Sequence, residues 1–162
     1  MQNPYAYGNA WFVDRLQYVD NANQELDAIK QLDLHHEAVA DSKFKAALGE
    51  AVKQEGTAFA RLDKYEPNEL QYTVQSPKGG VVVFSEIYYP GWTATVDGKD
   101  VEVGRVNYVL RAINVKPGEH KVVLTFKPAS VKNTETAAYA AYLLLALAII
   151  GGVVFEVRRK KE

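Results

Sequence analysis

The stretch from Ala137 to Phe155 constrains this chain most, because its 19 residues include no charged side chain. As an α-helix it would be about 28 Å long, close to the roughly 30 Å hydrocarbon core of a bilayer. A helix buried in a soluble domain is rarely apolar on every face. The sequence therefore predicts a transmembrane helix at residues 136–157 that contacts the lipid bilayer, and a buried core helix is the alternative.

The charges that flank this stretch predict its orientation. Four basic residues, 158–161, follow it directly, whereas the upstream flank carries only Lys127, Lys132 and Glu135. Basic residues accumulate on the cytoplasmic side of membrane spans. Residues 158–162 are therefore expected to form a basic cytoplasmic tail, and residues 1–130 to form an extracytoplasmic domain.

Export of residues 1–130 requires a signal sequence or an earlier span. Residues 1–30 are polar and contain no run that resembles the apolar region of a signal peptide. The simplest expectation is that the chain is the C-terminal piece of a longer membrane protein. Its partners would then include the transmembrane helices upstream in the parent chain.

Charge and cysteine content exclude several classes of function. The 19 basic and 20 acidic side chains leave a net charge of −1, so no broad surface for nucleic acid is expected. The absence of cysteine excludes disulfides, thiolate metal sites and cysteine nucleophiles.

The pattern of residues 1–130 is mainly that of β-strands. Short alternating segments separated by turns about every ten residues predict an antiparallel β-sandwich, jelly-roll-like, of about seven to nine strands. Residues 81–84 are apolar at every position, as in a central strand that is covered on both faces. Asp97-Gly98 predicts a two-residue hairpin turn. The inserted segments are one strand at 11–19, a helix at 21–32 with an apolar stripe of Leu26 and Ile29, a strand at 37–41, and a helix at 43–55.

Residues 85–128 (SEIYYPGWTATVDGKDVEVGRVNYVLRAINVKPGEHKVVLTFKP) resemble the C-terminal extracytoplasmic module of YfhO-type bacterial membrane proteins, and residues 3–13 (NPYAYGNAWFV) resemble its beginning. The resemblance implies a polytopic protein similar to GT-C glycosyltransferases, which use a polyprenyl-phosphate-linked sugar donor. It also implies that the catalytic acidic residues lie among earlier spans, and that the span at 136–157 is the last one.

Three aromatic residues around a Pro-Gly break form the candidate ligand site. Flat aromatic faces suit the CH faces of sugars, and a few polar groups usually fix a ligand's orientation. Tyr88 and Tyr89 are adjacent on an expected strand, so their side chains should face opposite ways. The alternative is that Trp92 and one tyrosine cap the core while Glu86 pairs with Arg105 or Arg111. The full candidate set is Glu86, Tyr88, Tyr89, Trp92, Arg105, Asn107 and Arg111.

No catalytic residue, metal site or cofactor is expected in this chain. His35 and His36 are adjacent and His120 is distant, so a metal site is not indicated. The expected function is that of an accessory domain in the bacterial cell envelope, which positions a glycan or glycolipid acceptor for a glycosyltransferase-like parent. The alternatives are a non-catalytic structural or protein-interaction sandwich of a membrane assembly, and a single-pass surface protein without an enzyme partner.

Overall fold

The computed structural model describes residues 7–128, 138–151 and 159–160. The chain divides into two units, Met1–Lys127 and Pro128–Glu162, which are considered one at a time. The first unit is built mainly from antiparallel strands, as the alternating sequence pattern predicts.

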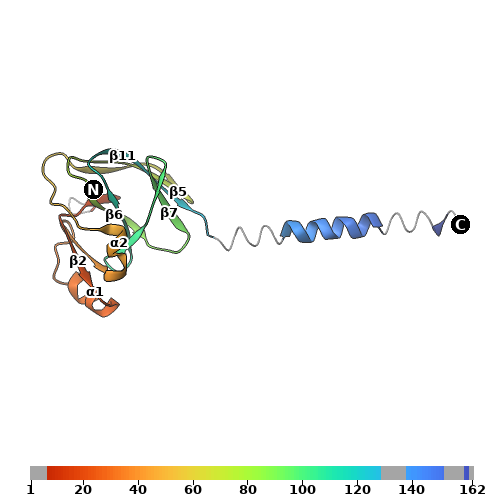
Figure 1. Cartoon of the computed structure of the whole chain (residues 1–162), viewed down its shortest axis with the longest axis horizontal. Coiled ribbons are helices and arrows are strands. Elements are labelled where there is room, and N and C mark those ends of the chain that lie inside the picture. Colours follow the sequence, from red (N-terminus) through yellow and green to blue (C-terminus); the bar gives the residue numbers. More distant parts are fainter. Residues whose placement is uncertain (1–6, 129–137, 152–158, 161–162) are drawn as a thin grey trace, which may run out of the picture. The chain divides into compact units, whose positions relative to one another are not determined.

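Two antiparallel sheets make up most of the first unit (Figure 1). The four-stranded sheet has the order β1 (Ala10–Phe12), β6 (Gly80–Ile87), β10 (Leu110–Val115), β9 (Gly104–Val106). The five-stranded sheet has the order β4 (Phe59–Glu66), β5 (Glu69–Ser76), β11 (Gly118–Phe126), β7 (Trp92–Val96), β8 (Lys99–Val101).

The main core lies between these two sheets. Leu70, Tyr72 and Val74 of β5 are buried on one face of the larger sheet and pack with Val82 and Phe84 of β6 in the smaller one. The intervening residues of β6, 81 and 83, belong to a second core on the other face. The prediction of a central strand covered on both faces is therefore confirmed for β6.

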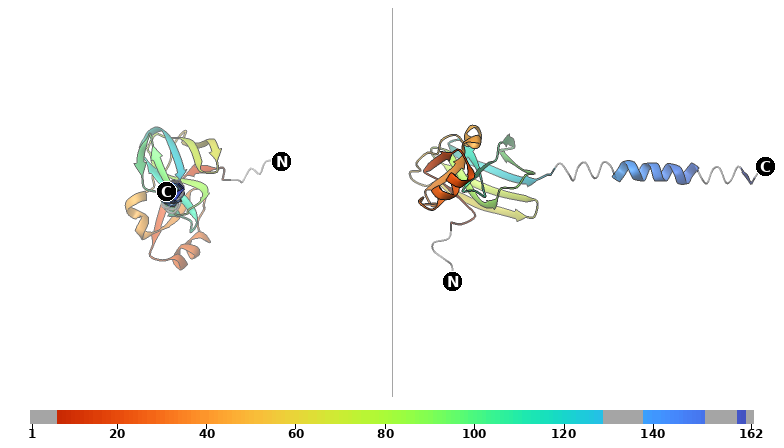
Figure 2. Two further views of the ribbon diagram at one scale, coloured as in Figure 1. Left: turned by 90° about the vertical axis from the view of Figure 1, so that its right-hand side faces the viewer. Right: turned by 90° about the horizontal axis from the view of Figure 1, so that it is seen from below.

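The second core forms because a parallel β-α-β unit covers the outer face of the smaller sheet. It consists of β2 (Arg15–Val19), α1 (Ala22–Ile29) and β3 (Glu37–Asp41), and β2 pairs with β3 in parallel. Figures 1 and 2 show α1 and β2 grouped on one side of the domain. The expectation of one strand at 11–19 was wrong, because the chain leaves the small sheet after Phe12 and starts the separate strand β2 at Arg15.

The two inserted helices are shorter than the sequence pattern indicates. Asn21 caps α1 as predicted, with its side chain accepting a 3.0 Å hydrogen bond from the Gln24 backbone N–H. The second helical segment comprises η1 (Ser42–Phe44) and α2 (Lys45–Leu48). It ends at Gly49 rather than at residue 55, because Gly49 adopts a positive φ of 60°.

Hairpin turns connect several neighbouring strands within each sheet of the sandwich. Asp97 and Gly98 have φ values of 51° and 76°, which confirms the predicted hairpin between β7 and β8. The hairpins β4–β5, β7–β8 and β9–β10 each stay within one sheet. This order differs from the jelly-roll-like expectation, in which the chain is wound as two successive Greek keys.

In the second unit, residues 138–151 form a helix whose described leucine and isoleucine side chains are exposed. Residues 136–137 and 152–157 of the predicted span lie outside the described residues, as do 158, 161 and 162 of the basic tail. Among the residues that the structure does describe, no helix has both the length and the apolar character needed to cross a membrane.

Candidate functional site

The three predicted aromatic residues line one groove at the end of the domain where β11 finishes. Its cavity volume is about 540 Å³. The loop that carries Tyr89 and Gly91 is fixed to its neighbours by backbone hydrogen bonds, from Tyr88 N–H to Val109 C=O (2.7 Å) and from Lys127 N–H to Gly91 C=O (2.7 Å). The lining residues are Tyr88–Ala94, Asp100–Val103 and Lys127.

The two adjacent tyrosines have different ring partners, although both lie beyond Ile87, the last residue of β6, and not in the strand that the sequence predicted. Tyr88 is half-buried, and its ring meets Phe44 edge-on at 5.6 Å in the second core. Tyr89 is exposed and its ring centroid lies 6.2 Å from that of Phe126. Both line the groove, and Tyr89 is the more accessible of the two to a ligand.

A buried arginine, Arg111, packs against the ring of Trp92. The Arg111 guanidinium carbon lies 4.0 Å from the centroid of the Trp92 ring, in a cation–π arrangement. Arg111 Nη2 also donates a 3.2 Å hydrogen bond to Glu86 Oε2. The alternative in which Glu86 pairs with an arginine and Trp92 caps the core thus describes this part of the geometry.

Two nitrogen atoms of the Arg111 guanidinium have no hydrogen-bond partner among the described residues. Arg111 is 2% exposed, and its Nε and Nη1 find no hydrogen-bond partner within the described residues. Burial lowers the pKa of Arg111, and it raises the pKa of the neighbouring Tyr72 to about 12, with the charge of Glu86 adding to that increase. The hydroxyl of Tyr72 is likewise unpaired within the described part of the chain.

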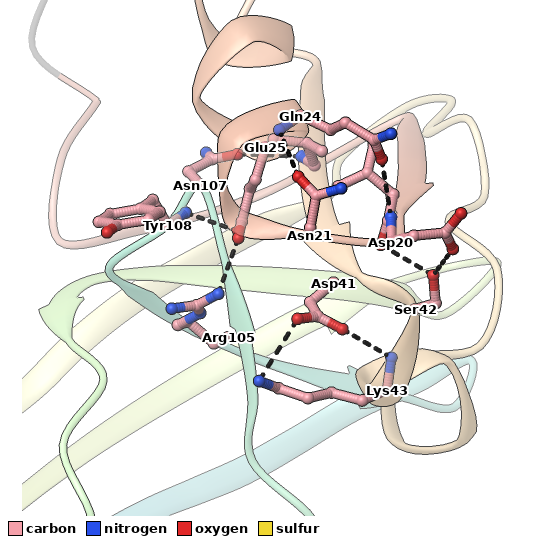
Figure 3. A network of polar contacts seen from close by, with 12 residues as sticks. Asp20, Asn21, Gln24, Glu25, Asp41, Ser42, Lys43, Arg105, Asn107 and Tyr108 are labelled. Atoms are coloured by element: carbon pink, nitrogen blue, oxygen red, sulfur yellow. Dashed lines mark hydrogen bonds and ion pairs between the residues drawn. The ribbon is translucent and has the colours of Figure 1, made fainter.

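Arg105 and Asn107 do not join the aromatic groove, contrary to the expectation from sequence. Figure 3 shows them at the junction between α1 and the β9–β10 connection. Arg105 Nη2 donates to Glu25 Oε2 at 2.7 Å, and the Tyr108 backbone N–H donates to Glu25 Oε1 at 2.7 Å. Asn107 exchanges hydrogen bonds with the backbone of Val39 in β3. These residues join the β-α-β unit to the sandwich.

Glu25 is the residue of this junction that the sequence analysis missed. Its side chain is fully buried, whereas Leu26, which was assigned to the buried stripe of the helix, is 42% exposed. The buried face of α1 is therefore rotated from the predicted one. Asp100, Glu102 and Lys127, which line the groove, were also not predicted, because they come from other turns and strand ends.

The histidines are engaged in pairs rather than in a metal cluster. Among the described residues, no group of three or more metal-ligating side chains comes together. His36 Nδ1 lies 3.0 Å from Asp14 Oδ2, and His120 Nδ1 lies 2.6 Å from Asp97 Oδ2. The ring of His35 stacks on Tyr7.

Comparison with known proteins decides the family. The profile described as "Bacterial membrane protein YfhO" matches residues 17–134. The chain belongs to this family. The match begins in β2 and runs past the end of β11, so the YfhO profile covers both the β-α-β unit and most of the sandwich. No curated protein and no solved structure matches the chain significantly. Membership of the YfhO family supports association with a bacterial membrane.

Proposed function

We propose that this chain is the extracytoplasmic accessory domain of a polytopic YfhO-type protein that resembles lipid-linked-sugar glycosyltransferases. In this proposal, the groove at Tyr88, Tyr89 and Trp92 positions a glycan or glycolipid acceptor. The observation that carries it is the groove itself, which combines an exposed tyrosine, a supported tryptophan and polar rim groups in about 540 Å³. Ligand sites in proteins commonly have volumes of about 300–1,000 Å³.

The side chains of the groove suit an uncharged sugar. The ring faces of Tyr89 and Trp92 offer flat apolar surface for sugar CH groups. The carboxylates of Asp100 and Glu102 can accept hydrogen bonds from hydroxyl groups, and Lys127 can donate them. Two carboxylates against one ammonium give the rim a net negative charge, which disfavours a phosphate group in the same place.

The proposed setting is the outer face of a bacterial cell membrane. The uncharged stretch within residues 136–157 supports a transmembrane anchor, and the four basic residues that follow it support a cytoplasmic tail. The family resemblance supports catalysis by acidic residues in earlier spans of the parent protein. This chain would then bind and orient, with the chemistry performed elsewhere.

A structural or protein-interaction role is the second candidate, and a specific contact favours it. The stack of Trp92, Arg111 and Glu86 links the two sheets at their open end, as a packing arrangement would. In this alternative, the aromatic groove fills space against a neighbouring part of the parent protein and contacts no sugar.

A binding measurement with matched tyrosine variants separates the two candidates. We expect the full chain in detergent to bind oligosaccharides or polyprenyl-linked sugars, as followed by calorimetric titration. Tyr89→Ala should weaken this binding by at least about tenfold, or about 1.4 kcal/mol. It should change the free energy of unfolding by less than about 1 kcal/mol, because Tyr89 is exposed.

Tyr65→Ala is the control, because Tyr65 is as exposed as Tyr89 but does not line the groove. It should leave sugar binding unchanged. Trp92→Ala should reduce binding and also cost about 2–4 kcal/mol of stability, since Trp92 is partly buried against the core and Arg111. Absence of binding by every glycan tested would favour the structural candidate.

A further inference from the structure

The most exposed large apolar side chains of the β domain occur together. Tyr65, Ile87 and Tyr89 are 65%, 66% and 62% exposed, whereas no other large apolar residue described in the domain exceeds 43%. Isolated exposed apolar residues are common on protein surfaces, but a group confined to one place indicates an interaction surface.

Strand register places these three side chains at one end of the sandwich. Phe126, the last residue of β11, pairs with Trp92 and contacts the ring of Tyr89. Ile87 is the last residue of β6. Tyr65 pairs with Leu70, which pairs with Leu124 close to the same end of β11. The surface formed by Tyr65, Ile87 and Tyr89 is called the exit surface below, because the chain leaves the domain beside it.

The opposite end of the sandwich exposes less apolar surface, where Phe59 is 37% and Val52 is 36% exposed. It carries the turns that connect β5 to β6, β7 to β8 and β10 to β11, and their exposed lysines are Lys78, Lys99 and Lys116. The most exposed apolar side chains therefore lie at one end of the strands, and those at the other end are much less exposed. A general tendency of this domain to expose apolar residues does not account for that asymmetry.

The path of the chain indicates what the exit surface contacts. Only residues 128–137 separate the domain from the apolar helix at 138–151. Ten residues span at most about 35 Å even when fully extended. If the apolar helix enters a bilayer, this short tether keeps the exit surface at a high effective concentration near the lipid headgroups.

We propose that the exit surface rests on the lipid bilayer, with Tyr65, Ile87 and Tyr89 in the headgroup layer. Tyrosine suits this layer, because its ring is apolar and its hydroxyl remains hydrated. The proposal rests on the membrane anchoring of residues 136–157 in the proposed function. It adds that the groove lined by Tyr89 opens at headgroup level, where the sugar of a glycolipid would lie.

The charges near the exit surface predict how the contact responds to salt. Lys64 lies 2.9 Å from Glu66 and 3.3 Å from Glu69, so this lysine is engaged by carboxylates instead of being available to anionic lipids. Lys127 in the adjoining groove is outnumbered by the carboxylates of Asp100 and Glu102, so the contact should be apolar in origin. It should not require anionic lipid, and it should persist at high ionic strength, which screens exposed charges.

The chain contains no cysteine, so a spin label attaches only to the one cysteine that is introduced. Single labels can therefore test this arrangement. The full chain is placed in phosphatidylcholine vesicles, with labels introduced at Ile87→Cys or, as controls, at Lys99→Cys or Lys116→Cys. A label at Leu144→Cys reports on anchoring. Collision with oxygen, which concentrates in lipid, is compared with collision with a water-soluble nickel complex.

We expect the ratio of oxygen to nickel accessibility at residue 87 to be several-fold higher than at residues 99 and 116. The ratio should survive about 1 M NaCl and should fall to the control value when Tyr65 and Tyr89 are both changed to serine. A lipid-exposed label at 144 with a control-like ratio at 87 would overturn the bilayer contact alone. A water-exposed label at 144 would overturn the anchoring as well.

Discussion

Two arginine–glutamate pairs, both containing residues of the predicted site, differ in which partner is buried. In the Arg105–Glu25 pair the carboxylate is fully buried and the arginine is partly exposed. In the Arg111–Glu86 pair the arginine is buried and the carboxylate side chain is 25% exposed. The first pair joins the β-α-β unit to the sandwich, and the second lies under the aromatic groove.

The difference lies in how well each buried charge is satisfied. The Glu25 carboxylate accepts hydrogen bonds from Arg105 and from the Tyr108 backbone N–H, and in this pair Arg105 Nε alone is buried without a partner among the described residues. Arg111 donates to Glu86, while its Nε and Nη1 have no partner among the described residues. A satisfied buried charge stabilises a junction, whereas an under-satisfied one contributes little to stability. The first pair is therefore interpreted as structural, and the second as support for Trp92.

The largest loss of stability is expected from substitution of Glu25. Glu25→Ala should cost about 3–5 kcal/mol of stability, because it leaves a cavity and removes the partner of Arg105 and of the Tyr108 N–H. Urea unfolding of the full chain in detergent, followed by near-ultraviolet circular dichroism, measures this loss. Asp27→Asn is the control on the same helix, since Asp27 pairs with Lys30 at the surface. A loss as small as that of the control would show that the junction does not depend on the buried carboxylate.

A smaller change in stability is expected from substitution of Arg111. Arg111→Met should change stability by about 1 kcal/mol or less, because methionine keeps an apolar contact with Trp92 and removes two unpaired donors. Glu86 is exposed enough to be hydrated when its partner is gone. The same unfolding measurement applies, and a loss as large as that of Glu25→Ala would remove the contrast between the two pairs.

The smallest effect concerns a third, more exposed pair. The Asp97 carboxylate, which accepts a hydrogen bond from His120 Nδ1, raises the pKa of His120. Because the folded-state pKa is raised, the stabilisation is complete below the unfolded value of about 6.5 and is lost as pH rises through the folded pKa. The melting temperature should therefore decline slightly as pH rises above about 6.5.

His120→Gln identifies this contribution, because His35 and His36 are present in both proteins. The decline in melting temperature above pH 6.5 should be shallower in the variant than in the unsubstituted chain. Equal slopes in the two proteins would show that the pair between the β7–β8 turn and β11 does not influence stability.

Local patterns predicted the sandwich but not the inserted unit. The alternating pattern predicted β5 and β11, the apolar run predicted β6, and Asp97-Gly98 predicted the hairpin turn. Each of these elements depends on residues that are neighbours in the sequence. Parallel pairing of β2 with β3 depends on contacts between distant segments and has no signature in one short segment. The early end of α2 was missed for a different reason, because the expected helix at 43–55 was extended past Gly49, whose positive φ of 60° ends it.

The candidate site was partly predictable for a similar reason. Tyr88, Tyr89 and Trp92 are close in sequence and stay together in the groove. Arg105 and Arg111 lie six residues apart on either side of the β9–β10 turn, and sequence alone does not show which sheet face each one occupies. The positive φ values of Asn107 and Tyr108 turn the chain toward α1, which places Arg105 and Asn107 in the junction with Glu25.

The orientation of the domain is the central claim of the account, and cysteine labelling in whole cells tests it most directly. Lys99→Cys or Lys161→Cys is introduced into the cysteine-free segment within the full-length parent protein, with any other cysteines in that parent removed. A membrane-impermeant maleimide should label residue 99 in intact cells, and should label residue 161 only after the membrane is permeabilised. Labelling of residue 161 but not of residue 99 in intact cells would contradict the proposed extracytoplasmic function.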